Sequence, residues 1–297
     1  MWDDAGRALR TLRDLLRFAV SRFTEAGLAF GHGCDNAYDE AAYLVLHTLH
    51  LPLDRLEPFL DARLTEGEIE RVLRVLQRRV AERIPAAYLT QEAWLGEFRF
   101  YVDPRVIVPR SHIAEVLEQL ETWLPEPAEV RSTLDLCTGA GCLGILLAHT
   151  FPNAAVDATD ISPQALEVAA RNVSDYGLNT RVRLLQSDLF DALEAARYDV
   201  IVSNPPYVTQ AAMQALPPEY RHEPAAALAG GDDGLDLVRR ILREAKRHLQ
   251  RGGVLIVEVG DGRAAVEAAF PDLPLTWLET AAGSDRVFLV ERGQLPG

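Results

Sequence analysis

The sequence is poor in the residues that build disulfide frameworks and metal centres. Its three cysteines, Cys34, Cys137 and Cys142, are too few and too irregularly spaced for a set of disulfides or a zinc site. The seven histidines show no ligand pattern either, because no cysteine or carboxylate cluster accompanies His47 and His50, which are three residues apart. We therefore expect a reduced protein without a metal.

Long apolar runs are also missing. No stretch approaches the roughly 20 residues that a membrane-spanning helix needs. The first residues carry Asp3, Asp4 and scattered arginines in place of the apolar core of a secretory signal. We expect a cytoplasmic protein with no part in a membrane.

Positive charge is scarce in the larger part of the chain. The formal net charge is -14, of which residues 1–90 carry -2 and residues 91–297 carry -12. An acidic surface repels phosphate, so we expect no stable binding of nucleic acid, and it attracts a basic protein. The N-terminal arginines leave a weak contact with RNA open, although alternating Arg and Glu is more typical of a solvated helix face (Arg71, Arg74, Arg78 and Arg79).

The 297 residues allow about two domains. Apolar residues at helical spacing predict helices over 11–26, 39–50 and 65–84, the last with a capping box formed by Thr65 and Glu68. Residues 1–88 are thus predicted to form a small helical domain that recognises the substrate. Alternation of apolar and polar residues predicts a β-hairpin linker over 89–108, followed by a second domain over 109–297.

The second domain shows strands and helices in alternation. Expected strands lie at 133–137, 155–159, 182–186, 200–203, 254–259, 275–279 and 286–290, and expected helices at 111–124, 142–150, 163–176, 235–249 and 264–270. Such alternation predicts an α/β fold with a mostly parallel, doubly wound, Rossmann-like sheet of seven strands. Ligands bind beyond the carboxyl ends of the strands in sheets of this kind.

The fourth expected strand stops at Asn204-Pro205-Pro206-Tyr207. Proline has no N–H for the sheet and fixes its own φ, so the strand must end at Asn204 on a stiff turn. The Asn204 side chain and the Pro205 carbonyl offer two acceptors to the hydrogens of an amide or amino nitrogen, and the Tyr207 ring offers a flat face. This arrangement suits methylation of a planar, weakly nucleophilic nitrogen, although Asn-Pro-Pro is also ordinary turn chemistry.

A glycine-rich loop follows the first strand, in Asp135-Leu-Cys137-Thr138-Gly139-Ala-Gly141. With Gly144 it satisfies the G-x-G-x-x-G dinucleotide pattern, which keeps a nicotinamide cofactor open as an alternative. The next two strands end at Asp160, placed for ribose hydroxyls, and at Asp188, placed for an adenine amino group. No acid for hydride transfer is evident, so S-adenosyl-L-methionine fits better. We interpret Cys137 as a packing residue and not as a nucleophile.

Together these motifs resemble the protein glutamine methyltransferases, over nearly the whole chain from Leu12 to Val290. The resemblance implies a class I S-adenosylmethionine-dependent fold with a helical N-terminal domain, and methyl transfer to a glutamine side-chain amide. The implied cofactor contacts are Asp135, Cys137, Thr138, Gly139, Gly141, Asp160, Ile161, Asp188, Leu189 and Asn204. The implied substrate contacts are Asn204, Pro205, Pro206 and Tyr207, with catalytic roles for Asn204, Pro205 and Tyr207.

One position departs from the family pattern. Members often carry Trp just after the acid of the third strand, where this chain has Leu189, so the wall for the adenine is expected from Phe190 or from an aliphatic residue. Glu223-Pro224 also resembles a family element, but no chemical step follows for it.

The segment Val108-Pro-Arg-Ser111-His-Ile-Ala-Glu115 resembles the branch that acts on the third protein of the large ribosomal subunit. The branch acting on release factors usually reads Pro-Arg-Pro-Glu-Thr-Glu at this place. We therefore expect a basic ribosomal protein of the large subunit, free or in an assembly intermediate, as the partner. The alternatives are a release factor and, as a second class, an amino group of RNA or DNA on a flipped base.

Overall fold

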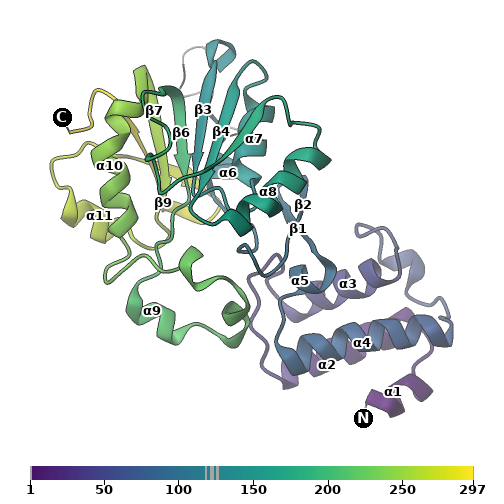
Figure 1. The fold of residues 1–297 in the computed structure, drawn as a ribbon. Coiled ribbons are helices and arrows are strands. Elements are labelled where there is room, and N and C mark those ends of the chain that lie inside the picture. Colours follow the sequence, from purple (N-terminus) through teal and green to yellow (C-terminus); the bar gives the residue numbers. More distant parts are fainter. Residues whose placement is uncertain (1, 118, 121–123, 125–126, 297) are drawn as a thin grey trace. The chain divides into compact units, whose positions relative to one another are not determined.

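The computed structural model describes residues 2–117, 119–120, 124 and 127–296. The chain divides into two compact units, each of which we describe by itself (Figure 1). The helical unit comprises Met1–Ala93 together with Leu216–Glu223, and the sheet unit comprises Trp94–Ala215 together with Pro224–Gly297.

The helical unit consists of α1 (Trp2–Ala8), α2 (Leu12–Glu25), α3 (Ala37–Thr48), α4 (Glu66–Glu82) and α5 (Ala86–Thr90), with a short 3-10 helix at Glu57–Phe59. Two capping boxes fix helix starts. The Thr11 hydroxyl accepts the N–H of Asp14 at the start of α2, and the Thr65 hydroxyl accepts the N–H of Glu68 at the start of α4. The apolar faces of these helices meet in one core, which includes Leu15, Leu44 and Leu76.

A segment from much later in the chain completes the helical unit. This inserted segment, Leu216–Glu223, contains a 3-10 helix at Pro218–His222. Its Glu219 is fully buried and accepts a hydrogen bond from Arg79 Nη1 at 3.2 Å and one from the Ala29 N–H at 3.1 Å. Arg79 also donates to Glu40 Oε1 at 2.6 Å. A buried ion pair thus ties the inserted segment to α3 and α4.

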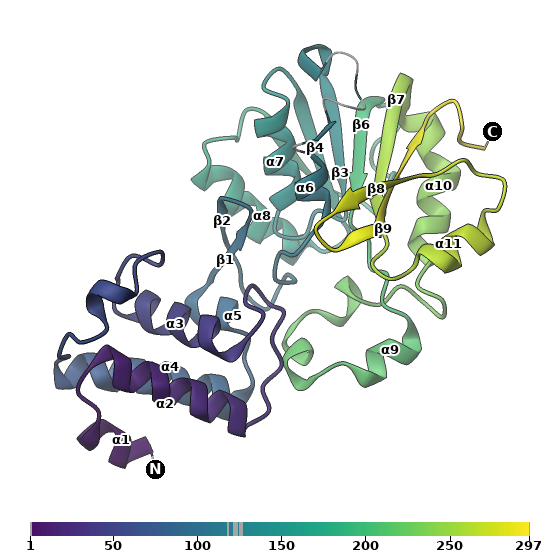
Figure 2. The same ribbon diagram turned by 180° about the vertical axis from the view of Figure 1, so that it is seen from behind.

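The sheet unit is built on seven strands in the order β5-β4-β3-β6-β7-β9-β8. Their bounds are β3 (Ser132–Leu136), β4 (Ala155–Asp160), β5 (Val182–Gln186), β6 (Tyr198–Ser203), β7 (Leu249–Glu258), β8 (Thr276–Thr280) and β9 (Gly283–Glu291). The first five of this order are parallel, whereas β9 runs antiparallel to β7 and to β8. Figure 2 shows β8 and β9 beside β7.

Helices cover both faces of this sheet. On one face, α10 (Asp236–His248) and α11 (Arg263–Ala269) share a core with Leu134, Leu136, Leu255 and Val257 of the strands. On the other face lie α6 (Ile113–Leu117), α7 (Cys142–Thr150) and α8 (Pro163–Asp175), which contact one another in sequence order (Figures 1 and 2). A separate two-stranded sheet is formed by β1 (Glu92–Leu95) and β2 (Phe98–Tyr101).

These findings confirm the predicted fold class. Each predicted strand of the large sheet lies where we expected it, with ends that differ by a few residues, and β6 ends directly before Asn204. The helix expected over 111–124 is described over Ile113–Leu117, and residues 118 and 121–123 lie outside the described residues. We did not expect α1, α5 or α9 (Gln210–Ala215). Within the described residues, none of the helices has the length and apolar character needed to cross a membrane.

Candidate active site

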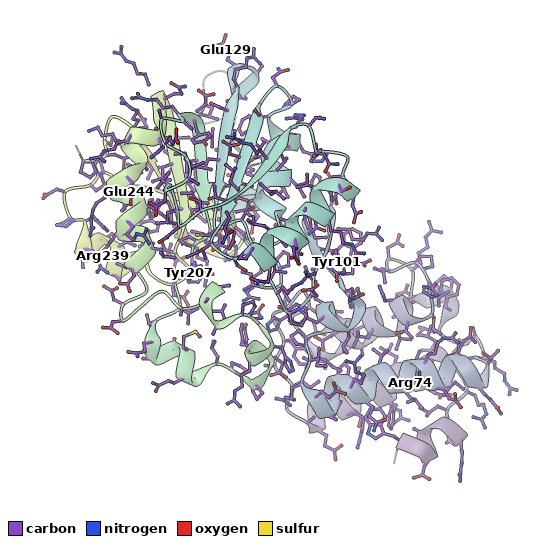
Figure 3. All side chains as sticks on the ribbon, viewed as in Figure 1. Arg74, Tyr101, Glu129, Tyr207, Arg239 and Glu244 are labelled. Atoms are coloured by element: carbon purple, nitrogen blue, oxygen red, sulfur yellow. The ribbon has the colours of Figure 1, made fainter. Side chains whose placement is uncertain are left out.

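The carboxyl ends of the parallel strands meet at one edge of the sheet. Pairing sets Leu136 at the end of β3 beside Thr159 of β4 and Ser203 of β6. The predicted site residues follow these strand ends and therefore gather at this edge: the loop Cys137–Gly141, Asp160, Asp188 and Asn204. Figure 3 shows Tyr207 at this end of the sheet and Glu129, which precedes β3, at the opposite end.

Asp135 lies beneath the glycine loop. It is 1% exposed, and its Oδ2 accepts hydrogen bonds from the Thr138 hydroxyl and, at 2.8 Å, from the Gly144 N–H. The Thr138 N–H in turn donates to the Thr159 carbonyl of β4 at 2.9 Å. Burial raises the pKa of Asp135 to about 7. This carboxyl group holds the shape of the loop from below.

The loop itself leaves open space at Gly139. Its φ of +54° favours glycine, and no atom lies within 4 Å of the point where a Cβ would stand. The Gly139 N–H donates to Asp160 Oδ2 at 2.9 Å, which fixes the loop to the end of β4. A Cβ on Gly141 would meet Ala169 of α8 at 3.1 Å, so this position serves helix packing. Cys137 packs against the core, and burial raises the pKa of its thiol, as suits a packing residue.

A cavity of about 340 Å³ opens beside Asp160 and is lined by Ile161, Gln186, Ser187, Asp188, Asp191 and Ala192. Ile161 is 62% exposed, so its apolar side chain is open to a ligand at this cavity. Asp188 Oδ1 accepts a hydrogen bond from Arg240 Nη1 of α10 at 2.9 Å. The cavity therefore combines an apolar wall with carboxylate and amide groups, which is the usual character of a small-molecule site.

The two residues after Asp188 face the core. Leu189 is 4% exposed with a φ of +52°, and Phe190 is 2% exposed. The Phe190 ring stacks on His248 at a centroid distance of 4.6 Å and an interplanar angle of 13°. Phe190 is not among the residues that line the cavity. Of these two side chains, Ile161 lines the cavity and Phe190 does not, and the wall for the adenine stays a prediction.

Asn204 is half-buried directly after β6. Within the described residues, its side-chain amide has no hydrogen-bond partner. The preceding Ser203 is buried, and its hydroxyl donates to the Leu136 carbonyl at 3.0 Å, which fixes the end of β6. The Asn204 amide itself stays available for a ligand. Pro205 and Pro206, which follow, restrict the backbone further.

Tyr207, by contrast, is held on several sides. A Cβ on Gly260 would stand 2.6 Å from its ring, and a Cβ on Gly230 would stand 2.6 Å from its Cα. Next to it, the Val208 N–H donates to the Leu228 carbonyl, and the Val208 carbonyl accepts the Gly230 N–H, both at 2.8 Å. Gly230 and Gly260 thus leave room for this loop because glycine has no side chain, and backbone hydrogen bonds fix the path of the loop.

Glu258, the last residue of β7, is a site residue that was not predicted from the sequence. This side chain is fully buried, and its carboxylate accepts hydrogen bonds from the Ser111 hydroxyl at 2.6 Å and the His112 N–H at 2.9 Å. The Tyr207 hydroxyl lies 3.4 Å from Glu258 Oε1. An available signal was an acid inside the apolar run 254–259, one residue before its end, whereas Asp160 and Asp188 follow their expected strands.

Comparison with known proteins identifies the family. A protein of Bordetella pertussis named ribosomal protein uL3 glutamine methyltransferase is 61% identical over 296 residues, which cover 99% of this chain and 99% of that protein. A protein of Neisseria meningitidis serogroup B with the same name is 58% identical over 298 residues, covering 100% of this chain and 98% of that protein.

This chain belongs to the ribosomal protein uL3 glutamine methyltransferase family. The methyltransferase small domain family also matches residues 116–217, which contain the glycine loop, both acids and the Asn204–Tyr207 turn. Membership confirms the predicted family and its ribosomal-protein branch, and it sets the nicotinamide alternative aside. The assignments of single residues to cofactor and substrate stay predictions.

The fold of this methyltransferase recurs in distant proteins. The hMettl16 catalytic domain, solved in complex with MAT2A 3'UTR hairpin 6, superimposes with a TM-score of 0.51 at 17% identity, covering 75% of this chain and 80% of that one. At so low an identity the likeness supports the methyltransferase fold alone.

Proposed function

We propose that this methyltransferase transfers a methyl group from S-adenosyl-L-methionine to the side-chain amide nitrogen of a glutamine in ribosomal protein uL3. The observation that carries the proposal is the Asn204 amide, which has no partner within the described residues and follows a strand end adjacent to the glycine loop. The names of the relatives support both the glutamine and uL3.

The cavity edge fits S-adenosyl-L-methionine. Open space at Gly139 leaves room for a ligand to approach the loop. The Asp160 carboxylate, which accepts the N–H groups of Gly139 and Ser162, is proposed to accept the ribose hydroxyls. Ile161 offers an apolar wall to the adenine, and Asp188 an acceptor for its amino group. When bound, this cofactor supplies a methyl group on a positively charged sulfur, ready for displacement.

The chain's own task is to orient the glutamine. Asn204 Oδ1 and the Pro205 carbonyl accept the two amide hydrogens, which aims the nitrogen lone pair at the methyl group and stabilises the positive charge that develops there. The flat face of Tyr207 restrains the amide plane. Alignment with the reacting atoms about 3 to 3.5 Å apart accounts for much of the rate, so no strong base is needed first.

The rest of the chain suits a basic protein partner. The charge of -12 over residues 91–297 attracts a basic ribosomal protein. The helical unit, with its own core, is proposed to recognise the parts of this protein that surround the glutamine. The proposed partner is uL3, either free or within an assembly intermediate.

The test is incubation of the purified protein with methyl-labelled S-adenosyl-L-methionine and three acceptors: free uL3, a peptide-chain release factor and ribosomal RNA. Mass spectrometry then locates the label. We expect one methyl group on a glutamine side chain of uL3 and little on the other acceptors. Label on the release factor would assign the other branch, and label on a base would overturn the proposed chemistry.

A further inference from the structure

Glu258 joins two segments that lie far apart in the sequence. Its Oε2 accepts the Ser111 hydroxyl and the His112 N–H, at 2.6 and 2.9 Å, and its Oε1 lies 3.4 Å from the Tyr207 hydroxyl. Ser111 is 8% exposed and its hydroxyl oxygen also accepts the Ile113 N–H, so the segment before α6 is itself well ordered by hydrogen bonds. A buried carboxylate is retained only where several donors meet it.

The hydroxyl group of Tyr207 is a donor at neutral pH. Burial, which is the largest cause, raises its pKa above the ordinary value, and the nearby Glu258 charge acts in the same direction. The protonated phenol therefore directs its hydrogen toward Glu258 Oε1, which lies 3.4 Å away. With Gly260 against the ring and Glu258 at its tip, the ring has little freedom to turn.

We propose that Glu258 is a positioning residue for methyl transfer. Its carboxylate is held by Ser111 and His112, and it fixes the Tyr207 ring as one wall of the glutamine site. The inference rests on the proposed function, because the proposed function places the glutamine amide against the Tyr207 ring. Glu258 acts on the reaction through the Tyr207 hydroxyl, which lies 3.4 Å from its Oε1.

The expected effect on rate comes from the orientation of the Tyr207 ring. A tyrosine ring that rocks about its Cα–Cβ and Cβ–Cγ bonds moves the amide that rests on it, and misplacement by 1 Å can cost about 10²-fold in rate. Loss of one hydrogen bond to a buried charged group corresponds to about a tenfold change. The loss is expected in kcat, because cofactor affinity depends on other residues.

The experiment compares Glu258→Gln, Tyr207→Phe and the double variant. Glutamine keeps a carbonyl oxygen for Ser111 and His112, but its amide nitrogen cannot accept the Tyr207 hydrogen. With uL3 as acceptor, each single variant is expected to lower kcat about tenfold while the Kd for S-adenosyl-L-methionine changes less than about twofold. In the double variant the second substitution should cost almost nothing more, because both remove the same contact.

A matched control exists in the same unit. The Tyr198 hydroxyl donates to Asp157 Oδ2 at 2.7 Å, a second tyrosine–carboxylate pair, placed at the start of β6 and within β4. Tyr198→Phe is expected to leave kcat unchanged. If Glu258→Gln does not fold, Ser111→Ala takes its place. This variant keeps Glu258 but removes one of its hydrogen-bond donors, so we expect a smaller loss of kcat.

The outcomes separate the two proposals. If the wild-type protein does not methylate uL3, the proposed function fails. If the wild type is active and Glu258→Gln or Ser111→Ala retains full kcat, the positioning role is overturned. Losses from Glu258→Gln and Tyr207→Phe that multiply in the double variant would likewise overturn it, because the two side chains would then act independently.

Discussion

Asn204 and Tyr207 are three residues apart in one loop and have opposite surroundings. The Asn204 amide has no partner within the described residues, whereas the Tyr207 ring is enclosed by Gly260 and its hydroxyl faces Glu258. A site that orients a glutamine amide needs both properties. The Asn204 amide must be available to bind the substrate, and the Tyr207 ring must stay fixed so that the bound amide keeps its orientation.

The availability of Asn204 leads to a prediction on rate. Asn204→Ala is expected to lower kcat by about 10²-fold or more, because one of two acceptors for the amide hydrogens is lost. The Kd for S-adenosyl-L-methionine, measured by isothermal titration, should change little. Asn179→Ala, at an exposed position in the loop before β5, is the control and should leave both quantities unchanged. Full turnover of Asn204→Ala would refute the assigned role.

Asp135 leads to a prediction on stability. Its native pKa of about 7 stands above the ordinary value of 3.8, so between these pH values the folded state binds more protons than the unfolded state. The contribution of this group to the free energy of unfolding is therefore present below about pH 4 and falls as pH rises to about 7, by at most about 1.4 kcal/mol for each pH unit.

Urea unfolding of the wild type and of Asp135→Asn across pH 4 to 8 measures this contribution. Asparagine cannot ionise, so the wild type should lose stability relative to the variant as pH rises to about 7, and the difference should then level off. A difference that stays constant or grows in favour of the wild type would contradict the prediction.

At the scale of elements, one arginine of α4, Arg79, connects this helix to the inserted segment Leu216–Glu223. Arg79 is fully buried and donates to Glu40, to Glu219 and, at 2.8 Å, to the Ala29 carbonyl. Burial raises the pKa of Glu40, and Arg79 opposes that shift. Such a pair adds little compared with apolar packing, but removing one partner leaves an uncompensated buried charge.

Arg79→Ala is therefore expected to lower the free energy of unfolding by about 3 to 5 kcal/mol. Arg74, labelled on α4 in Figure 3, is exposed on the same helix, and Arg74→Ala should change stability by less than about 0.5 kcal/mol. Chemical denaturation followed by circular dichroism compares the two. Equal losses would show that the effect comes from the helix and not from the buried pair.

At the scale of the whole molecule, the net charge of -14 predicts salt-dependent capture of a basic substrate. Raising ionic strength from about 0.05 to 0.5 M shortens the screening length severalfold, so the KM for uL3 should rise while kcat stays nearly constant. An uncharged glutamine peptide from the same site is the control and should show no such rise. A KM for uL3 that does not respond to salt would contradict electrostatic capture.

The sheet and much of its site edge were predictable from the sequence, because both depend on local patterns. Apolar runs that stop at Asp160 or Asn204 mark strand ends, and parallel strands bring their ends together whatever lies between them. Glu258 and Glu219 were not recognised as partners, since their contacts are with Ser111 and Arg79, 147 and 140 residues away. Pairings over such separations leave no periodic trace in a single sequence.

The inserted segment has one further consequence. The polypeptide passes between its two units at residues 93–94, 215–216 and 223–224. A fragment that ends at residue 93 lacks Glu219, and a fragment that begins at residue 94 carries Glu219 without the arginine that neutralises it. In a hybrid of two relatives joined at 93–94 or at 215–216, Arg79 and Glu219 come from different parents, whereas exchange of the short segment together with the helices takes both from the same parent.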